Sequence, residues 1–392
     1  MYETAMLALD CHGSQIVSIH VKRTYALLPS GRCAPSEIQL PLVVARPSGS
    51  TPDKQAGAPW LEESDVLPMK PSTDLIVMAE ACPPRGAVEM IASIEIAKLR
   101  RDYRISGERR AIYRGRGSIS FSAPLALDRL PIRHESAYGG IDPTVPNPKV
   151  ECMMDLMTIH PGIYPRNACG MGYVVYENAE RLDGLLLPQI EHPSQLVTPD
   201  TVVTGCPENW WRQPLPWSCD WFDRTWYPRC AYLGGFPDHI PEEDAMMPEI
   251  RMGWVDSQRS RLARADATGD VASVLDPRLT NAASPGLVLP FLEGDEAVRL
   301  QGMTPDGDLV VQLPGERPKM QVRFEGRTYD VEVVPNRVVI STEEMGVYIV
   351  WHGAWRTPRQ LPDRLPVQDD TMKMELEGVD VFVDGRKIEP LG

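Results

Sequence analysis

Alternation of hydrophobic and polar residues marks the N-terminal part of the chain and predicts β-strands there. In residues 15–27, QIVSIHVKRTYAL, valine and isoleucine side chains alternate with Ser18 and His20. A period of two carried by β-branched residues is typical of a strand. Residues 38–45 and 74–81 predict two further strands, each interrupted or bounded by prolines.

The same alternation returns in the C-terminal part. Strand patterns appear in EAVRLQGMTPDGDLVVQLPG (296–315), in the segment 320–355 and in MKMELEGVDVFVDGRKI (372–388), and the alternation is regular in MQVRFEGRTYDVEVV (320–334). The tetrapeptides PDGD and FEGR are tight-turn sequences, so these segments predict hairpins.

The central part is less regular. Residues 88–113 could form a helix by the spacing of their isoleucines, but alternation and a turn at 106–109 favour two or three strands. Short helices are predicted near 179–182, 242–247 and 256–265.

The proline and glycine content indicates the fold class. The chain has 38 prolines and 30 glycines, which suit turns and strand edges and not long helices. We therefore predict a mainly β protein (α+β with few short helices), with β-sandwich-like sheets and long proline-rich ordered loops. A β-rich unit over 1–286 with a central loop region and a smaller β-rich unit over 287–392 are expected.

Composition narrows the class of protein. With 392 residues, 43% hydrophobic content and 24% charged content, the chain is typical of a globular protein. Its net charge of −14 argues against a nucleic-acid binder. The N-terminus has no secretory pattern, no apolar run is long enough to span a membrane, and the eight cysteines contain no CxxC pair. These features predict a cytoplasmic protein without membrane insertion.

No catalytic motif stands out. The seven histidines are scattered, and the chain has no HExxH, GxSxG or P-loop sequence, so we expect no catalytic residue, cofactor or metal. The alternative is a carbohydrate-active enzyme or glycan-binding module, which would use paired carboxylates beside a tryptophan. The densest carboxylates are at 242–249 and 293–296.

Two glycine-punctuated loops predict a structural framework. In SAYGG, Gly139 and Gly140 permit positive φ or close backbone approach, and Tyr138 can pack beside them while its hydroxyl caps a carbonyl. In NACGMGY, Asn167 can hydrogen-bond loop backbone, while Gly170 and Gly172 remove side chains where two segments cross.

An aromatic stretch and a basic cluster are candidates for binding a protein partner. Aromatic and arginine side chains are enriched at interface hot spots. The predicted partner-binding residues are Trp210, Trp211, Trp217, Trp221, Trp226, Tyr232, Arg100, Arg101 and Arg104. The alternatives are an aromatic core for the first group, and solvated strand faces with local ion pairs for the arginines.

The order of motifs resembles a bacterial family that was long filed as a domain of unknown function. Its members are found beside type VI secretion spike genes and are treated as effector adaptors or chaperones. The matching residues are Lys70, Pro71, Thr73 and Asp74 (Lys-Pro-x-Ser/Thr-Asp), Gly107 and Arg109, Tyr138 to Gly140, and Asn167, Gly170, Gly172 and Tyr173. The chain departs from the family at Ala168, where a proline is usual, and in the tryptophan-rich region.

The resemblance implies a non-enzymatic adaptor. Its partners would be a secreted toxin effector, a PAAR-like domain or the VgrG spike protein, and it would promote effector loading onto the spike. A structural subunit of the secretion apparatus is the remaining alternative.

Overall fold

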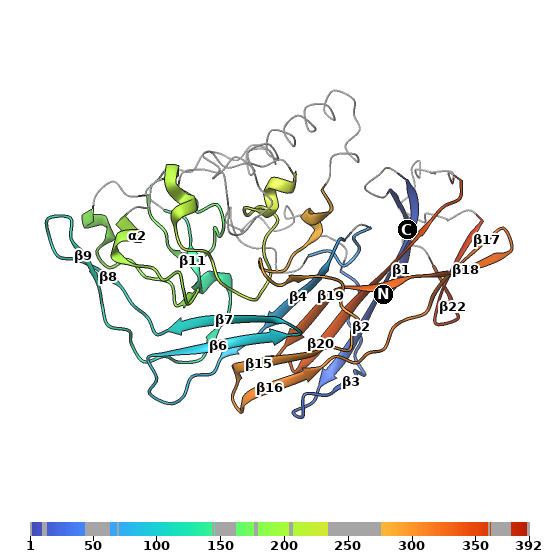
Figure 1. Ribbon diagram of the computed structural model, residues 1–392, viewed down its shortest axis with the longest axis horizontal. Helices are drawn as coiled ribbons and strands as arrows, with labels where there is room; N and C mark the ends of the chain where they lie inside the picture. Colours follow the sequence, from blue (N-terminus) through green and yellow to red (C-terminus); the bar gives the residue numbers. More distant parts are fainter. Residues whose placement is uncertain are drawn as a thin grey trace, which may run out of the picture.

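The fold is known from a computed structural model. It describes residues 2–9, 14–43, 63–68, 70–142, 145, 162–175, 179–203, 207–233, 276–359, 361 and 378–389; the other residues are drawn as a thin grey trace in Figure 1.

The protein is mainly β, as predicted. A seven-stranded sheet, the central sheet, contains β1 (Glu3–Leu9), β2 (Gln15–Leu27), β20 (Gly346–Arg356), β19 (Val333–Ser341), β4 (Thr73–Met78) and β14 (Val288–Leu289) in that order, with β3 (Cys33–Pro35) on β2. Its pairs are antiparallel except for β19 and β4, which run parallel.

A five-stranded sheet, the second sheet, contains β13 (Ile190–Glu191), β7 (Leu99–Ser106), β6 (Glu89–Ile96), β15 (Ala297–Thr304) and β16 (Gly307–Gln312). The strand prediction for residues 88–113 is therefore confirmed against the helical alternative. A four-stranded sheet contains β18 (Arg327–Val331), β17 (Met320–Phe324), β21 (Val379–Val383) and β22 (Arg386–Ile388).

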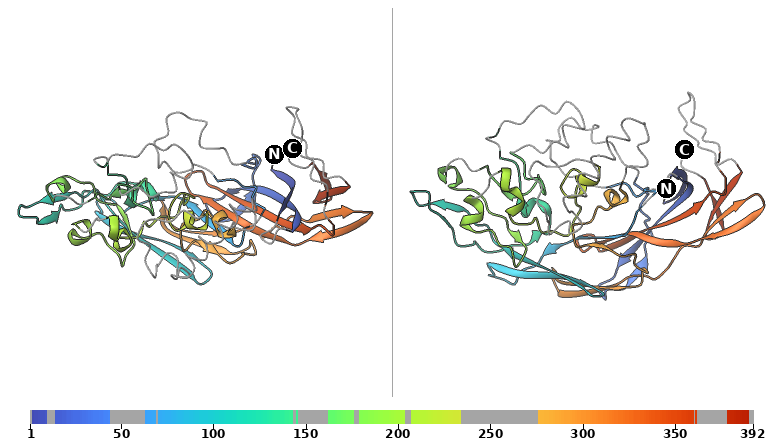
Figure 2. Two further views of the ribbon diagram at one scale, coloured as in Figure 1. Left: turned by 90° about the horizontal axis from the view of Figure 1, so that it is seen from above. Right: turned by 45° about the horizontal axis from the view of Figure 1, so that its top comes forward.

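Three two-stranded pairs hold the loop region. They are β5 (Glu80–Ala81) with β10 (Leu130–Pro131), β11 (Tyr138–Gly139) with β12 (Met171–Gly172), and β8 (Ala111–Tyr113) with β9 (Ile119–Phe121). In Figures 1 and 2 the β8–β9 pair and the four-stranded sheet lie at opposite ends of the molecule.

Two strand predictions need correction. The single strand predicted at 74–81 is split at Ala79, whose carbonyl accepts from Ile132 N, so that β4 and β5 join different sheets. Residues 38–43 form no strand, because the Gln39 side chain takes the place of a neighbouring strand: its amide pairs with the Thr24 N–H at 2.9 Å and the Thr24 carbonyl at 2.8 Å.

Helices are short. They comprise α2 (Pro199–Val203) and the 3-10 turns η2 (His134–Ser136), η3 (Ala179–Leu182), η4 (Pro207–Arg212), η5 (Arg229–Leu233) and η6 (Pro277–Thr280). The helix predicted at 179–182 is thus one 3-10 turn, and the predictions at 242–247 and 256–265 lie outside the described residues.

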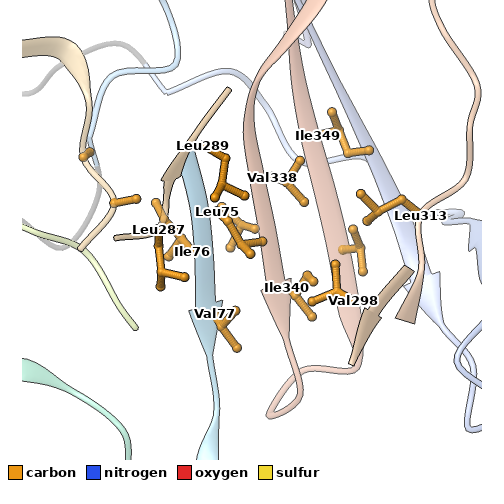
Figure 3. Close-up of a cluster of buried hydrophobic side chains, with 14 of the residues drawn as sticks. Leu75, Ile76, Val77, Leu287, Leu289, Val298, Leu313, Val338, Ile340 and Ile349 are labelled. Atoms are coloured by element: carbon orange, nitrogen blue, oxygen red, sulfur yellow. The ribbon is translucent and has the colours of Figure 1, made fainter. Parts of the chain in front are cut away.

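The main hydrophobic core lies between sheets. Alternate side chains of the central sheet, such as Leu75, Val338 and Ile349, lie in one cluster with Val298 and Leu313 from the region of the second sheet (Figure 3). This packing of one face on another is sandwich-like. Strands from both sides of residue 287 share these two sheets, while the four-stranded sheet comes wholly from residues beyond it. The proposed division into two folding units stays a prediction.

Candidate functional site

The face of the central sheet opposite Leu75, Val338 and Ile349 carries a buried group of polar and charged side chains. On it lie Ser18, His20, Lys22, Asp74, Arg337 and His352. Cross-strand register aligns them: Asp74 is opposite Arg337, and His20 is opposite His352. We call these six residues, with Glu63, Asp65 and Lys70 that cover them, the polar face.

Asp65 is the centre of the charged contacts. Its carboxylate accepts from Lys22 Nζ at 2.9 Å, from Arg337 at 2.6 Å and from the Val43 N–H at 2.9 Å. Arg337 also donates to the carbonyls of Glu63 and Ser64. These contacts fix residues 63–65 on strands β2 and β19.

Glu63 extends the contacts to the tryptophan-rich loop. It accepts from Arg229 and Arg224, each at 2.8 Å. Burial opposes ionisation of Glu63, but the two guanidinium groups outweigh it and lower the pKa to about 2. Arg229 also donates to the carbonyls of Phe222 and Leu279, so one arginine holds three loop segments.

Lys70 and Asp74, the residues of the first family motif, form a buried ion pair. Lys70 Nζ lies 2.5 Å from Asp74 Oδ2, and the same oxygen accepts from the Ala282 N–H at 2.7 Å. Burial lowers the pKa of Lys70 to about 8, against the opposing effect of Asp74. The motif therefore anchors the loop at residue 282 to strand β4.

Two histidines close the polar face. The rings of His20 and His352 stack with centroids 4.9 Å apart, and Ser18 Oγ lies 2.9 Å from Nε2 of each. A hydroxyl has one proton, so it donates to one ring nitrogen and accepts from the other. Burial lowers the pKa of His352 to about 4, helped by Lys70, and burial with His352 lowers the pKa of His20. Both rings are neutral at neutral pH.

The SAYGG and NACGMGY loops cross at the parallel pair β11–β12. Asn167 Nδ2 donates to the carbonyls of His134 at 2.8 Å and Tyr138 at 3.1 Å. The Tyr138 hydroxyl donates to Gln213 Oε1 at 2.7 Å, so it binds a side-chain amide where a carbonyl of the chain was predicted.

The glycines sit where these loops touch. At Gly139, with φ +149°, an added Cβ would lie 2.2 Å from the Asn167 carbonyl oxygen, and at Gly170 it would lie 2.6 Å from the Ala137 carbonyl oxygen. Gly140 and Gly172 also have positive φ and close neighbours. The loops therefore cross at a distance that excludes side chains.

Sequence reasoning missed the pairing of His134 with Asp220. His134 Nδ1 lies 2.5 Å from Asp220 Oδ1, which also accepts from Ser218 Oγ at 2.6 Å. The buried imidazole packs edge-on against Phe222 and near Trp226. No motif signals this contact, since 86 residues separate the partners.

The aromatic stretch is divided between core and surface. Trp210, Trp221 and Trp226 are buried, so in this conformation they support the surface and do not form it. Trp211, Trp217 and Tyr232 are half-buried, and an arginine guanidinium stacks on each ring. Partner binding by the aromatic stretch stays a prediction.

The predicted basic residues are engaged in the protein's own contacts. Arg101 is buried and stacks on Trp217, 3.6 Å from the ring centroid. Arg100 pairs with Glu95 and Asp102, and Arg104 pairs with Glu89 and Glu191. Burial of one arginine and pairing of the other two leave this strand without surplus positive charge.

The carboxylates of the glycan alternative are also engaged where they are described. Glu296 accepts from the N–H groups of Glu293 and Gly294, and Glu293 pairs with Arg317. The other acidic segment, 242–249, lies outside the described residues.

The described parts of the chain contain no group of three or more His, Cys, Asp or Glu side chains that could hold a metal ion. Among the described residues, no helix has the length and apolar character needed to cross a membrane.

Fold and site together define a β-rich scaffold in which ion pairs and close glycine contacts hold long loops on the sheets. The chain belongs to the family described as an uncharacterized protein conserved in bacteria (DUF2169), whose model matches residues 12–352. No curated protein and no solved structure matches the chain.

Proposed function

We propose that this protein is a cytoplasmic, non-enzymatic adaptor that binds a type VI secretion effector, or its PAAR-like domain, and promotes its loading onto the VgrG spike. The ordered motif set of the chain suggests this role. An adaptor needs a surface that keeps its shape before the partner arrives, because preorganisation lowers the cost of binding.

The observation that carries the proposal is that the residues of the family motifs hold loops in place. Lys70 and Asp74 anchor a loop to the central sheet. Asn167 and the glycines around it hold two further loops in contact. The motif residues thus build a scaffold for loops, and loops positioned by a rigid scaffold are common binding elements.

The half-buried aromatic residues are the contacts we assign to the partner. Trp211 and Tyr232 each combine an aromatic ring with a stacked arginine, Arg212 at 4.7 Å and Arg278 at 4.5 Å. Aromatic and arginine side chains are the residue types most enriched among interface hot spots.

Co-expression tests the proposal. The chain is produced with the effector, the PAAR-like protein and the VgrG protein of its host, each in turn, and complexes are isolated through a tag on the chain. We expect a stable complex with the effector or the PAAR-like protein. Failure of all three proteins to co-purify overturns the proposal.

Variants locate the contact. Trp211→Ala and Tyr232→Ala should weaken the complex, whereas Trp355→Ala, a half-buried tryptophan on β20, is the matched control and should not. Equal weakening by all three variants would show that loss of stability, and not loss of contact, explains the result.

A further inference from the structure

Two exposed arginines of the basic cluster without an ion pair in the described part of the chain lie together in the turn between β8 and β9, while Lys98, also exposed and without one, lies in the turn between β6 and β7. Of the arginines in residues 98–116, Arg109 pairs with Glu191 and Arg110 with Glu108. Arg114 donates to Ser120 Oγ at 2.8 Å and makes no ion pair, and Arg116 makes no contact of either kind with the described part of the chain. Both side chains are exposed. We call residues 114–118 the arginine tip.

The arginine tip stands clear of the rest of the protein. A Cβ added at Gly115 or Gly117 would have no atom within 4 Å. Figures 1 and 2 show β8 and β9 projecting at the end of the molecule away from the four-stranded sheet. A partner surface can therefore reach both arginines without displacing any described segment.

The hairpin that carries the tip is firmly held. Ala111 and Ile119 are buried in a second hydrophobic cluster with Tyr138 and Tyr164. Ala111 exchanges backbone hydrogen bonds with Gly184 and Leu185, and the turn itself is closed by the Arg114 N–H on the Ser118 carbonyl at 2.8 Å. A rigid support loses little conformational entropy on binding.

The turn has an unusual backbone conformation. Gly115, Arg116 and Gly117 all have positive φ, at +86°, +50° and +77°. Three successive residues with positive φ make a sharp turn, and Arg116 is the middle residue of the three. Of the acidic side chains nearby, Glu108 pairs with Arg110 before the start of β8, and Asp183 accepts from the Tyr113 N–H beside the tip.

We infer that the arginine tip is a docking site for an acidic surface of a protein partner. A positive projection on a chain of net charge −14 is a local reversal of the field, which orients an acidic partner toward this one point. The same net charge disfavours a nucleic acid, whose binding depends on many phosphate contacts. This inference deepens the proposed function, because the partner would be the effector or spike protein.

A peptide assay tests the docking site. The probe is a short fluorescein-labelled Glu-Ser repeat peptide, with a Gln-Ser peptide as the neutral control, and binding is read by fluorescence anisotropy. The variant Arg114→Gln with Arg116→Asn removes two charges, and asparagine tolerates positive φ. We expect its affinity for the acidic peptide to fall about fivefold to tenfold, with weaker binding of the wild type at high salt.

Arg327→Gln with Arg386→Gln is the matched control. It also removes two positive charges. Each of these arginines is exposed and directly follows a glycine with positive φ, at the start of β18 or β22. It should keep wild-type affinity within about twofold. Circular dichroism and urea midpoints equal to those of the wild type show that all variants fold.

The inference is overturned if the control variant loses as much affinity as the tip variant, if the wild type does not bind the acidic peptide, or if a single-stranded oligonucleotide binds the tip more tightly than the peptide. The co-expression experiment separates it from the proposed function. An effector that co-purifies equally with wild type and tip variant leaves the adaptor role and removes this surface. If the acidic peptide binds at the tip but no secretion protein co-purifies, the docking site is kept and the adaptor role is removed.

Discussion

Acidification should destabilise the protein between about pH 6.5 and pH 4 through the two stacked histidines of the polar face, His20 and His352. His352 has a pKa of about 4 in the folded protein, against an ordinary value of 6.5. In this window the unfolded chain binds a proton that the folded chain does not, so unfolding is favoured as the pH falls. The stability is fully present above the unfolded pKa and is lost as the pH falls toward the folded pKa.

The magnitude follows from the two pKa values. For His352 alone, the linkage relation gives a loss of about 2 kcal/mol by pH 5 and about 3 kcal/mol by pH 4. His20, whose pKa is also lowered, adds to the loss in the same direction. Glu63 acts at lower pH, because its pKa falls from 4.5 to about 2 and its contribution is lost only in that range.

Urea unfolding followed by tryptophan fluorescence, from about pH 7.5 to about pH 5, separates the histidines from the carboxylates. His352→Gln keeps an amide near Ser18 Oγ and removes the titration, so its free energy of unfolding should depend less on pH than that of the wild type. His192→Gln, at a histidine that packs on Trp217 outside the polar face, is the control and should keep most of the wild-type slope. Equal slopes in the wild type and the His352 variant would refute the reasoning.

Three further changes test the framework by urea unfolding. Asp65→Asn removes one carboxylate charge and leaves two buried cations without it, which should cost about 3–5 kcal/mol; a cost below about 1 kcal/mol would contradict this. Gly139→Ala should cost about 3 kcal/mol or prevent folding, because its Cβ would meet a backbone oxygen, while Gly326→Ala, with open space around it, should cost about 1 kcal/mol. Similar losses at both glycines would count against the close-crossing argument. Tyr138→Phe should cost about 1 kcal/mol by removing the hydrogen bond to Gln213, and an unchanged urea midpoint would show that this bond contributes nothing.

The strands could be predicted because their signal is local. Alternation in residues 15–27 depends only on the chain's own pleat, and β2 covers those residues. The division of residues 74–81 between two sheets could not be predicted, because it depends on a hydrogen bond from Ile132, more than fifty residues away. Local pattern indicates a strand but not which neighbour it joins.

The polar face could not be predicted for the same reason. In β2 the alternation suggests one buried side and one solvated side. The structure buries both, and on the polar side Asp65 lies against Lys22. The alternation of a strand does not show whether a segment distant in the sequence covers one of its faces.

The basic cluster shows how pairing decides the meaning of charge. Arg100 and Arg104 look like a docking patch when the arginines are counted along the sequence. Once β6 and β7 pair, Glu95 stands opposite Arg100, and Glu191 on β13 stands opposite Arg104. Arg100 and Arg104 are thus paired with carboxylates of neighbouring strands and Arg101 is buried, whereas Arg114 and Arg116 in the turn are exposed and have no ion pair with the described residues.

The two faces of the central sheet divide the work of folding. Burial of apolar side chains on one face supplies most of the stabilisation, because it scales with area and does not depend on direction. Ion pairs on the other face contribute little net stability, since desolvation offsets their attraction. Their distances and angles are specific, however, and one carboxylate or guanidinium group holds several segments at once, as Asp65 and Arg229 do. The polar face therefore determines where the loops lie. Binding of a partner to these loops would depend on the polar face even if the partner contacts none of the polar-face residues.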